Sequence, residues 1–379
     1  MHRKSIYFSL SLALLVFVGF SGFSNSQEAP ADTLNPDQIV KEIESAVQEK
    51  VEALEEEAFN PNEMIMHHVL DAHEWHLWGH TSLPLPIILW DEGLHMFSSA
   101  KFHHGEDVVE SNGKYYFVYH EKIYRTDASG QLNMDDHGHP TNVKPLDLSI
   151  TKNVFSMLIS ALVLMLLFMS MARSYKKNPG APKGLAAWLE PLVLFVRDEI
   201  AKPYIGEAKH RKFIGFLLTV FFFIWVNNLM GLIPFFPGGA NLTGNISVTV
   251  VLGLFSFIII NVSGNKHYWG HLFDPMGSSM PLVAKIPLYI ILVPIEVAGI
   301  FIKVAALMIR LFANITAGHI IVLSLIAIIF VKNSIGWAGL SVPMTLFIST
   351  LELLVAALQA YIFTMLTALF IGQATQDHH

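Results

Sequence analysis

Residues 286–331 decide the fold, and they read IPLYIILVPIEVAGIFIKVAALMIRLFANITAGHIIVLSLIAIIFV. Apolar residues dominate this stretch, yet Arg310 lies near its middle, with Asn314 one helical turn farther on. A cation at the centre of a lipid-spanning helix costs roughly 2.5–3.5 kcal/mol on insertion scales, so it is retained where it faces protein or water and has a function there. The stretch therefore predicts a membrane helix with a functional arginine.

Composition extends this interpretation to the whole chain. The 379 residues are 53% hydrophobic and only 15% charged, well below the roughly 25% charged residues of an ordinary soluble domain. The net charge of −7 comes mostly from acidic residues between positions 28 and 57, and nothing indicates nucleic-acid binding. Cysteine is absent, which excludes disulfides and thiolate chemistry. The chain is predicted to be a polytopic membrane protein in the lipid bilayer.

Apolar segments predict five transmembrane helices, at residues 150–171, 213–235, 246–262, 286–331 and 342–371. At about 1.5 Å per residue, the fourth is much longer than the roughly 30 Å hydrocarbon core, so it must tilt, kink or divide. Residues 185–205 are less apolar and are expected at the membrane surface. The predicted fold class is all-α integral membrane, with two long tilted helices in a membrane domain at residues 148–375.

Basic residues orient these helices. Clusters follow the first predicted span and precede the second, which places both on one side of the membrane. The positive-inside rule assigns that side to the cytoplasm. The N-terminus is then extracytoplasmic and the C-terminus cytoplasmic.

The region before the membrane domain has two predicted parts. Residues 1–26 have the basic start, apolar run and small polar exit of a signal peptide, with an uncleaved first membrane helix as the alternative. Residues 27–147 form an acidic, histidine-rich extracytoplasmic segment. Within it, residues 27–60 have apolar residues at helical spacing, and residues 114–125 (KYYFVYHEKIYR) predict a β-hairpin.

Three histidines of this segment suggest a metal site. His73, His76 and His80 are spaced i, i+3, i+7 and would share one face of a helix, as ligands of a divalent metal can. The alternative is a solvated segment whose histidines bind nothing.

Polar side chains recur along the arginine helix. Glu296 and Lys303 lie fourteen and seven residues before Arg310 and fall on nearly the same face, because seven residues are almost two turns. Asn314 shares that face. A purely structural ion pair is the alternative for Glu296 and Lys303, and helix-to-helix hydrogen bonding is the alternative for Asn227 and Asn228.

The last apolar segment carries matching polar groups. Glu352 and Gln359 lie seven residues apart, and in an antiparallel helix pair Gln359 lies level with Arg310 while Glu352 lies level with His319. Histidine beside a carboxylate is suited to proton exchange. His319 lies nine residues from Arg310, half a revolution on an ideal helix, so either the helix is distorted at Gly318 or the two side chains face different partners.

A specific combination of motifs now emerges, namely residues 309–314 (IRLFAN) with Gly318, Glu352 with residues 358–363 (LQAYIF), residues 228–234 (NLMGLIP), and Glu296. Over residues 148–375 the chain resembles the a subunit of F-type ATP synthase, the ATPase protein 6 family. The resemblance implies a proton-conducting stator in the bacterial inner membrane, with sodium as the alternative ion. Its implied partners are the c-subunit ring, the b-subunit peripheral stalk and, through the complex, the F1 sector.

The resemblance also implies a role for each polar residue. Arg310 would separate two offset half-channels, and Gln359 would assist it. His319 and Glu352 would line the outer half-channel with Asn314 and Asn228, while Glu296, with Lys303 as support, would belong to the cytoplasmic side. No cofactor is implied, and the chain has no G-x-x-x-x-G-K-[ST] loop, so ATP chemistry would belong to partner subunits.

The chain departs from this family at three points. Bacterial members carry an acid at the position of His319 and a histidine at that of Glu352, so the two residues are exchanged here. Met308 is larger than the usual residue two positions before the arginine, so packing against the ring is expected to differ. The histidine-rich segment is also outside the family core.

Two other functions compete with this interpretation. A secondary transporter of cations or metals, with the histidine-rich segment as a capture domain, predicts internal repeats, and none is visible. A non-conducting membrane scaffold predicts that Arg310 and Glu352 can be neutralised without loss of ion flux.

Overall fold

The structure is a computed structural model. It describes residues 61, 65–66, 69–78, 81–178, 182–233, 236, 238–274, 282–332 and 334–376. They belong to one compact unit, Asn60–His379. The predicted signal peptide and the predicted helix within residues 27–60 lie outside the described residues.

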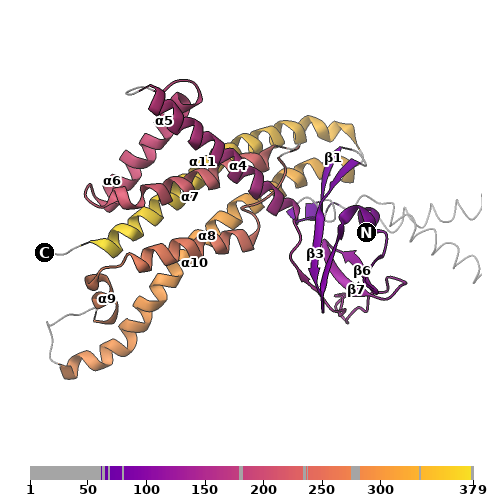
Figure 1. The fold of residues 1–379 in the computed structure, drawn as a ribbon, viewed down its shortest axis with the longest axis horizontal. Helices are drawn as coiled ribbons and strands as arrows, with labels where there is room; N and C mark the ends of the chain where they lie inside the picture. The colour runs from indigo at the N-terminus through magenta and orange to yellow at the C-terminus, as the bar shows by residue number, and fades with distance from the viewer. Residues whose placement is uncertain are drawn as a thin grey trace, which may run out of the picture. The chain divides into compact units, whose positions relative to one another are not determined.

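Helices make up most of the described chain (Figure 1). The long ones are α4 (Lys152–Lys177), α7 (His210–Leu232), α8 (Ile246–Val262), α10 (Leu282–Val331) and α11 (Ala338–Thr375). They cover all five segments predicted to span the membrane. Among the described residues, α4, α7, α10 and α11 are each long and apolar enough to cross a bilayer. A fifth span exists if α8 and α9 (Lys266–Phe273), bent by 100° at the break between them, are one broken span.

The arginine helix is one uninterrupted helix. α10 contains 50 residues, which is about 75 Å of helix at 1.5 Å per residue. The division that its length suggested therefore does not occur. α7, α10 and α11 share one apolar core, whose largest fully buried members include Leu217, Leu307 and Phe363. This core fixes α10 against α11 and so positions the polar residues between them.

The segment predicted at the membrane surface is helical. It comprises α5 (Leu185–Phe195), a π-helical turn η2 (Val196–Ala201) and α6 (Lys202–Ile205). Gly372 of α11 lets this segment approach, because a Cβ there would overlap the carbonyl oxygen of Tyr204. The structure also has two short 3₁₀ helices, η1 (Ser99–Gly105) and η3 (Ile335–Trp337).

Residues 74–147 are β-structured, so the all-α prediction omits this part of the chain. The strands are β1 (Glu74–Trp78), β2 (Thr81–Pro84), β3 (Pro86–Trp90), β4 (Leu94–Ser98), β5 (Val109–Ser111), β6 (Lys114–Tyr119), β7 (Lys122–Thr126) and β8 (Leu146–Asp147). They form three small antiparallel sheets, ordered β1-β2, β4-β3-β8 and β5-β6-β7. A separate apolar core holds them together, with Leu89 and Tyr116 fully buried. We call residues 74–147 the β region.

The predicted hairpin at residues 114–125 is confirmed. β6 pairs with β7, and the chain reverses at His120 and Glu121. Both turn residues have positive φ, 47° and 60°, which is what the tight turn of a two-residue hairpin requires.

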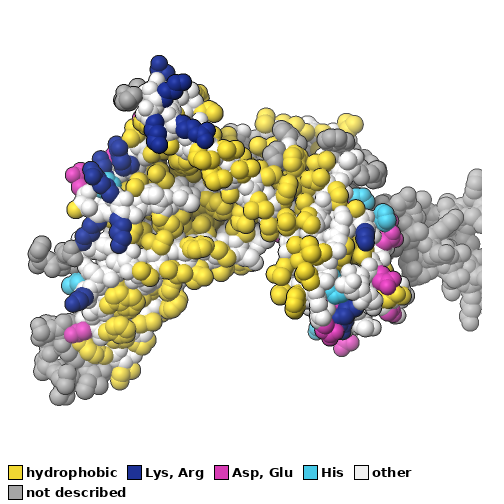
Figure 2. All heavy atoms as spheres, viewed as in Figure 1, with side chains coloured by type: hydrophobic (Ala, Val, Ile, Leu, Met, Phe, Trp, Pro, Cys, Tyr) yellow, Lys and Arg dark blue, Asp and Glu magenta, His cyan; other side chains and the backbone are white. Residues whose placement is uncertain are grey.

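Charged side chains gather at two ends of an apolar surface (Figure 2). Lys and Arg cluster over α5, α6 and the start of α7, whereas Asp, Glu and His cluster over the β region. Hydrophobic side chains cover the helices between these ends. This distribution fits a protein whose middle lies in lipid.

Candidate functional site

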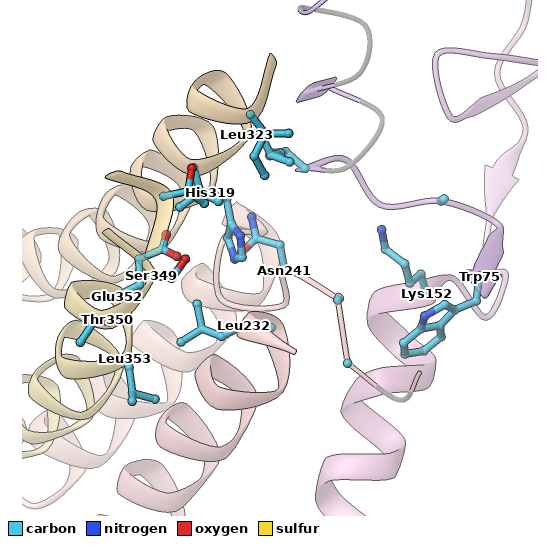
Figure 3. Close-up of a pocket in the computed structure, with 18 of the residues that line it drawn as sticks. Trp75, Lys152, Leu232, Asn241, His319, Leu323, Ser349, Thr350, Glu352 and Leu353 are labelled. Carbon is cyan, nitrogen blue, oxygen red and sulfur yellow. The ribbon is translucent and has the colours of Figure 1, made fainter. Parts of the chain in front are cut away.

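A cavity with both polar and apolar lining residues lies where α10 and α11 meet the connection between α7 and α8. Its volume is about 670 Å³ (Figure 3). His319 of α10 and Glu352 of α11 both line it, as does Asn241 from the α7–α8 connection. The sequence placed His319 and Glu352 at the same depth, and they lie in the wall of one cavity. Direct contact between them stays a prediction.

Two glycines make room for these side chains. A Cβ at Gly318 would overlap Oε1 of Glu352 and would lie 3.0 Å from its Cδ, so the carboxylate rests directly on the α10 backbone. A Cβ at Gly231 would lie 3.8 Å from Nε2 of His319 and 3.2 Å from the carbonyl oxygen of Ala240. Because α10 is continuous through Gly318, this glycine acts by close approach, and the distortion considered from the sequence is not needed.

Arg310 points to different surroundings from His319. Its side chain is exposed, while His319 is half-buried beside the cavity. Among the residues that the structure describes, Arg310 has no hydrogen bond and no ion pair. Its neighbours on the exposed face of α10 include Ala306, Ala313 and Ile309, which are apolar and also exposed. The described chain therefore supplies no counter-ion to Arg310.

Gln359 contacts Asn314, one helical turn beyond Arg310. The Asn314 side chain donates a hydrogen bond from Nδ2 to Oε1 of Gln359, over 3.0 Å. Gln359 is only 2% exposed, and its Nε2 has no partner among the described residues. The depth match predicted between Arg310 and Gln359 is thus correct to within one turn, and the amide pair links α10 to α11 beside the arginine.

Asn228 joins three elements. Its Oδ1 accepts a hydrogen bond from Oγ1 of Thr243 at 2.5 Å, and its Nδ2 donates to the carbonyl of Ala356 at 3.5 Å. Asn227, also buried, donates to the carbonyl of Phe223 within α7. These contacts match the helix-joining alternative, and a place for Asn228 on the proton path stays a prediction.

Glu296 and Lys303 do not pair within the described chain. Glu296 is half-buried, and the exposed Lys303 places its ammonium 5.4 Å from the ring centre of Phe370. The structural ion pair considered from the sequence does not form, because Lys303 turns toward α11.

Met308 packs inside the chain. A Cβ at Gly253 of α8 would overlap Met308, so the methionine packs against α8 inside the chain. Its size is matched by a glycine on the neighbouring helix, and its effect on packing against the ring stays a prediction.

The proposed metal ligands do not share a helix face. His76 lies in strand β1, where side chains alternate between faces, and His73 precedes it. Nε2 of His73 is hydrogen-bonded to Oδ2 of Asp147 at 2.7 Å. His80 and the side chain of His76 lie outside the described residues. Within those residues no group of three His, Cys, Asp or Glu side chains is arranged to hold a metal ion.

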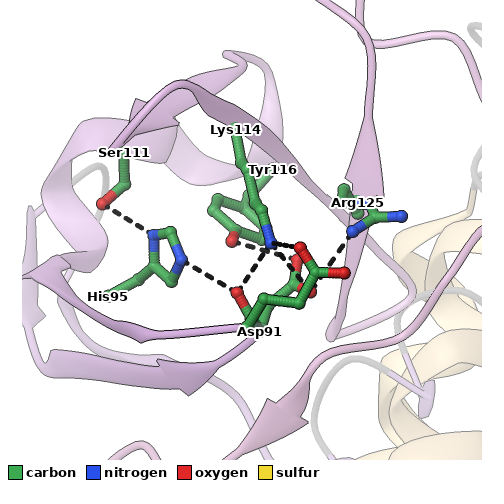
Figure 4. A network of polar contacts seen from close by, with 7 residues as sticks. Asp91, His95, Ser111, Lys114, Tyr116 and Arg125 are labelled. Atoms are coloured by element: carbon green, nitrogen blue, oxygen red, sulfur yellow. Dashed lines mark hydrogen bonds and ion pairs between the residues drawn. The ribbon is translucent and has the colours of Figure 1, made fainter.

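The densest ionisable cluster outside the membrane helices surrounds Asp91 (Figure 4). Lys114 and Arg125 lie 3.2 and 3.3 Å from its Oδ1, and the hydroxyl of Tyr116 donates to Oδ2 at 3.3 Å. Burial raises the pKa of Asp91, but its bonds to Lys114 and the two cations outweigh burial and leave that pKa lowered. Burial and the neighbouring carboxylate raise the pKa of Tyr116 to about 12. The cluster holds the β region together.

Several cavity residues escaped the sequence analysis. Glu74, Trp75 and Lys152 line the cavity on one side, and Thr345 lines it on α11. Lys152 lies at the start of the first predicted span, and the β-region residues gave no helical periodicity, so no pattern connected them with His319. Only the fold brings them together.

The fold and this cavity define a polytopic membrane protein with half-buried titratable side chains between its helices. The chain belongs to the ATP synthase A chain family, whose model matches residues 154–372. It is 40% identical to ATP synthase subunit a 2 of Prosthecochloris aestuarii over 309 residues, covering 78% of this chain and 92% of that protein. It is 48% identical to ATP synthase subunit a 2 of Chlorobaculum tepidum over 247 residues (62% and 67%).

A third relative, ATP synthase subunit a of Chloroherpeton thalassium, is 46% identical over 238 residues, covering 61% of this chain and 69% of that protein. Residues 64–148 match a second family, described as a domain of unknown function. That match ends at residue 148, next to the β region's last strand and before α4 begins.

Proposed function

We propose that this chain is the proton-conducting stator subunit of the ATP synthase membrane sector in a bacterial inner membrane. The observation that carries the proposal is an exposed arginine on an apolar helix face, next to a hydrogen-bonded Asn314–Gln359 pair and to a cavity lined by histidine and carboxylate. In the assembled enzyme the c-subunit ring, the b-subunit stalk and the F1 sector are its partners.

The exposed face of α10 is the docking face for the ring. Arg310 is surrounded there by small side chains, Ala306, Ala313 and Ala317, which let a neighbouring helix approach closely. A ring carboxylate that comes within about 4–6 Å of Arg310 has its pKa lowered by roughly 1–3 units. Each passing carboxylate therefore loses its proton at the arginine.

The cavity is the outer half-channel of this proposal. His319 and Glu352 stand in its wall, and the Asn314–Gln359 pair lies between them and Arg310 along α10 and α11. Glu296 lies toward the other end of α10, where the cytoplasmic half-channel begins. Arg310 separates the two, because a fixed cation opposes the passage of protons along a water chain.

Charge distribution sets the orientation. The end bearing Lys and Arg faces the cytoplasm by the positive-inside rule, and the cavity and the β region face the other side (Figure 2). Protons are the proposed ion, because both His319 and Glu352 exchange protons.

ATP-driven proton uptake into inverted membrane vesicles tests the function. Arg310→Ala is expected to abolish uptake while the complex stays assembled. Arg173→Ala, an exposed cation at the C-terminal end of α4, is the matched control and should pump normally. Undiminished pumping by an assembled Arg310→Ala complex would refute the stator role.

A further inference from the structure

The β region supplies part of the wall of the cavity. Glu74 and Trp75 line it from strand β1, and Lys152 lines it from the first turn of α4. His319 and Glu352 lie across from Trp75 and Lys152, as the view into the cavity shows (Figure 3). The ATP synthase A chain family model matches residues 154–372. Of these cavity residues, only His319 and Glu352 fall within that range.

Hydrogen bonds fix the start of this region to α4. Asp71 accepts from the backbone N–H of Asn153 at 3.0 Å and from Oγ1 of Thr151 at 2.8 Å. The backbone N–H of Lys152 donates to the carbonyl of Ala72 at 2.9 Å. A carboxylate at a helix N-terminus satisfies free N–H groups and interacts favourably with the helix dipole. Strand β1 is therefore held directly above the first turn of a membrane helix.

Trp75 packs this strand onto the membrane domain. Its ring meets Phe155 of α4 edge-on at 5.8 Å between centroids, and Phe236 of the α7–α8 connection at 5.3 Å. Tryptophan and phenylalanine exclude water where they meet. The cavity also has polar groups in its wall, since Nδ2 of Asn241 and Oγ1 of Thr345 are buried without a partner among the described residues. Such groups in a cavity of this volume hold water.

Next to Trp75, a histidine–carboxylate pair connects the cavity to the surface. Nδ1 of His104 lies 2.8 Å from Oε1 of Glu74, and Oγ of Ser82 donates to Oε2 of Glu74 at 3.0 Å. The His104 side chain is 45% exposed, whereas that of Glu74 is only 16% exposed. One end of the pair therefore meets bulk water and the other lines the cavity.

We propose that His104 and Glu74 form the outer proton-collecting site of the half-channel, so that the β region is part of the proton path. The inference rests on the proposed function, since it needs the cavity to conduct protons. His104 takes a proton from outside water and passes it across the hydrogen bond to Glu74. Glu74 releases it to cavity water, from which His319 and Glu352 receive it. Only a proton moves, and no bond between heavy atoms changes.

The charges around the cavity support this direction of transfer. Glu74 and Glu352 are the carboxylates in the cavity wall, Lys152 is its cation, and Glu74 is the carboxylate that pairs with the exposed His104. Clefts lined by one sign of charge raise the local concentration of counter-ions and their rate of arrival by about 10-fold or more, and a single carboxylate beside a lysine can supply at most the lower end of that effect. Glu74 therefore collects protons even where Lys152 opposes cations deeper inside.

A purely structural pair is the competing account, and the chain contains a matched control for it. His103 neighbours His104 in η1 and pairs with Asp107 at 2.5 Å. Both side chains of this pair are exposed, and neither lines the cavity. His103 and His104 both have positive φ, so replacing either places the same kind of strain on the backbone. A structural role predicts equal effects at the two pairs, whereas proton collection predicts an effect at one.

The test uses the whole enzyme in liposomes, with ATP synthesis driven by an imposed proton gradient. Glu74→Gln and His104→Gln are expected to lower the rate by up to about tenfold at low ionic strength, the lower end of the range for electrostatic focusing, and by less at high salt. His103→Gln and Asp107→Asn should synthesise ATP at the wild-type rate. Wild-type rates for Glu74→Gln at every salt concentration, or equal losses at both pairs, would overturn the proposal.

A second measurement avoids any defect in folding or assembly. The chain has no cysteine, so Glu74→Cys can be modified after the enzyme has assembled, with membrane-impermeant thiol reagents of opposite charge. An anionic reagent should restore most of the rate, and a cationic one should lower it further. Equal effects of the two reagents would contradict a charge-based role. Arg310→Ala separates the two hypotheses. Normal activity of Arg310→Ala would refute the proposed function, whereas normal activity of Glu74→Gln with an inactive Arg310→Ala refutes only this inference.

Discussion

The contact between Gly318 and Glu352 makes the arrangement of α10 and α11 testable by one methyl group. In Gly318→Ala the new Cβ would overlap Oε1 of Glu352 and would lie 3.0 and 3.1 Å from its Cδ and Cγ. The carboxylate must therefore leave its position or push the two helices apart. Overpacking of a well-packed core costs typically about 1–3 kcal/mol, and this range is an upper bound here because the flexible Glu352 side chain can move away.

That cost translates into a rate. If the whole cost is added to the activation free energy of proton transfer at Glu352, proton flow drops roughly 5- to 150-fold, since about 1.4 kcal/mol corresponds to a factor of ten. The assay is the rate of ATP-driven proton uptake in vesicles that contain equal amounts of assembled complex. Gly215→Ala is the matched control, because nothing lies within 4 Å of a Cβ on Gly215 of α7.

A compensating change sharpens the test. Glu352→Asp withdraws the carboxylate by about one bond length, roughly 1.5 Å, and removes the overlap with residue 318. Gly318→Ala combined with Glu352→Asp should therefore pump faster than Gly318→Ala alone. A Gly318→Ala enzyme that pumps at the wild-type rate, or a double variant slower than either single one, would refute the close contact.

Two further predictions concern the hydrogen-bond networks. In Thr243→Val the buried Oδ1 of Asn228 loses the donor at 2.5 Å, which should destabilise the purified complex by roughly 1–3 kcal/mol in thermal unfolding, while Thr219→Val, at an exposed hydroxyl of α7, should have little effect. The folded pKa of Asp91 lies below its usual value of 3.8, so the stability it contributes is present above that pH and is lost as pH falls through the folded pKa. Hydrogen exchange at residues 109–126, corrected for intrinsic rates, should accelerate only below about pH 4, and a steady acceleration between pH 7 and 5 would contradict this assignment.

Local patterns predicted the membrane helices well. All five apolar segments are helical, and α8 coincides with residues 246–262, because lipid-facing helices must be apolar over their whole length. Seven-residue spacing also placed the interacting residues of α10 and α11 near one another. Asn314 reaches Gln359, and Glu352 rests on Gly318, since antiparallel helices of equal rise preserve relative depth.

Contacts between distant segments were beyond the sequence patterns. The strands of the β region are two to six residues long, too short for a clear alternation, and only the aromatic hairpin at residues 114–125 was visible. The histidine spacing suggested a helix face, but His76 lies in a strand. In an extended chain, residues spaced i, i+3, i+7 do not share one face. Lys152 and Glu74 line the same cavity because Asp71 is hydrogen-bonded to the N-terminus of α4. The bonded residues are 80 or more positions apart in the sequence, so local patterns could not predict this contact.

The central claim is that the charge of Arg310 separates two half-channels. Passive proton flow through membranes stripped of the F1 sector tests this claim most directly. The account predicts that Arg310→Ala membranes, although unable to pump, still dissipate an imposed pH gradient, because the barrier between two hydrated paths has been removed. A fully assembled Arg310→Ala sector that is impermeable to protons would contradict it, since the arginine would then belong to the path and would not divide it.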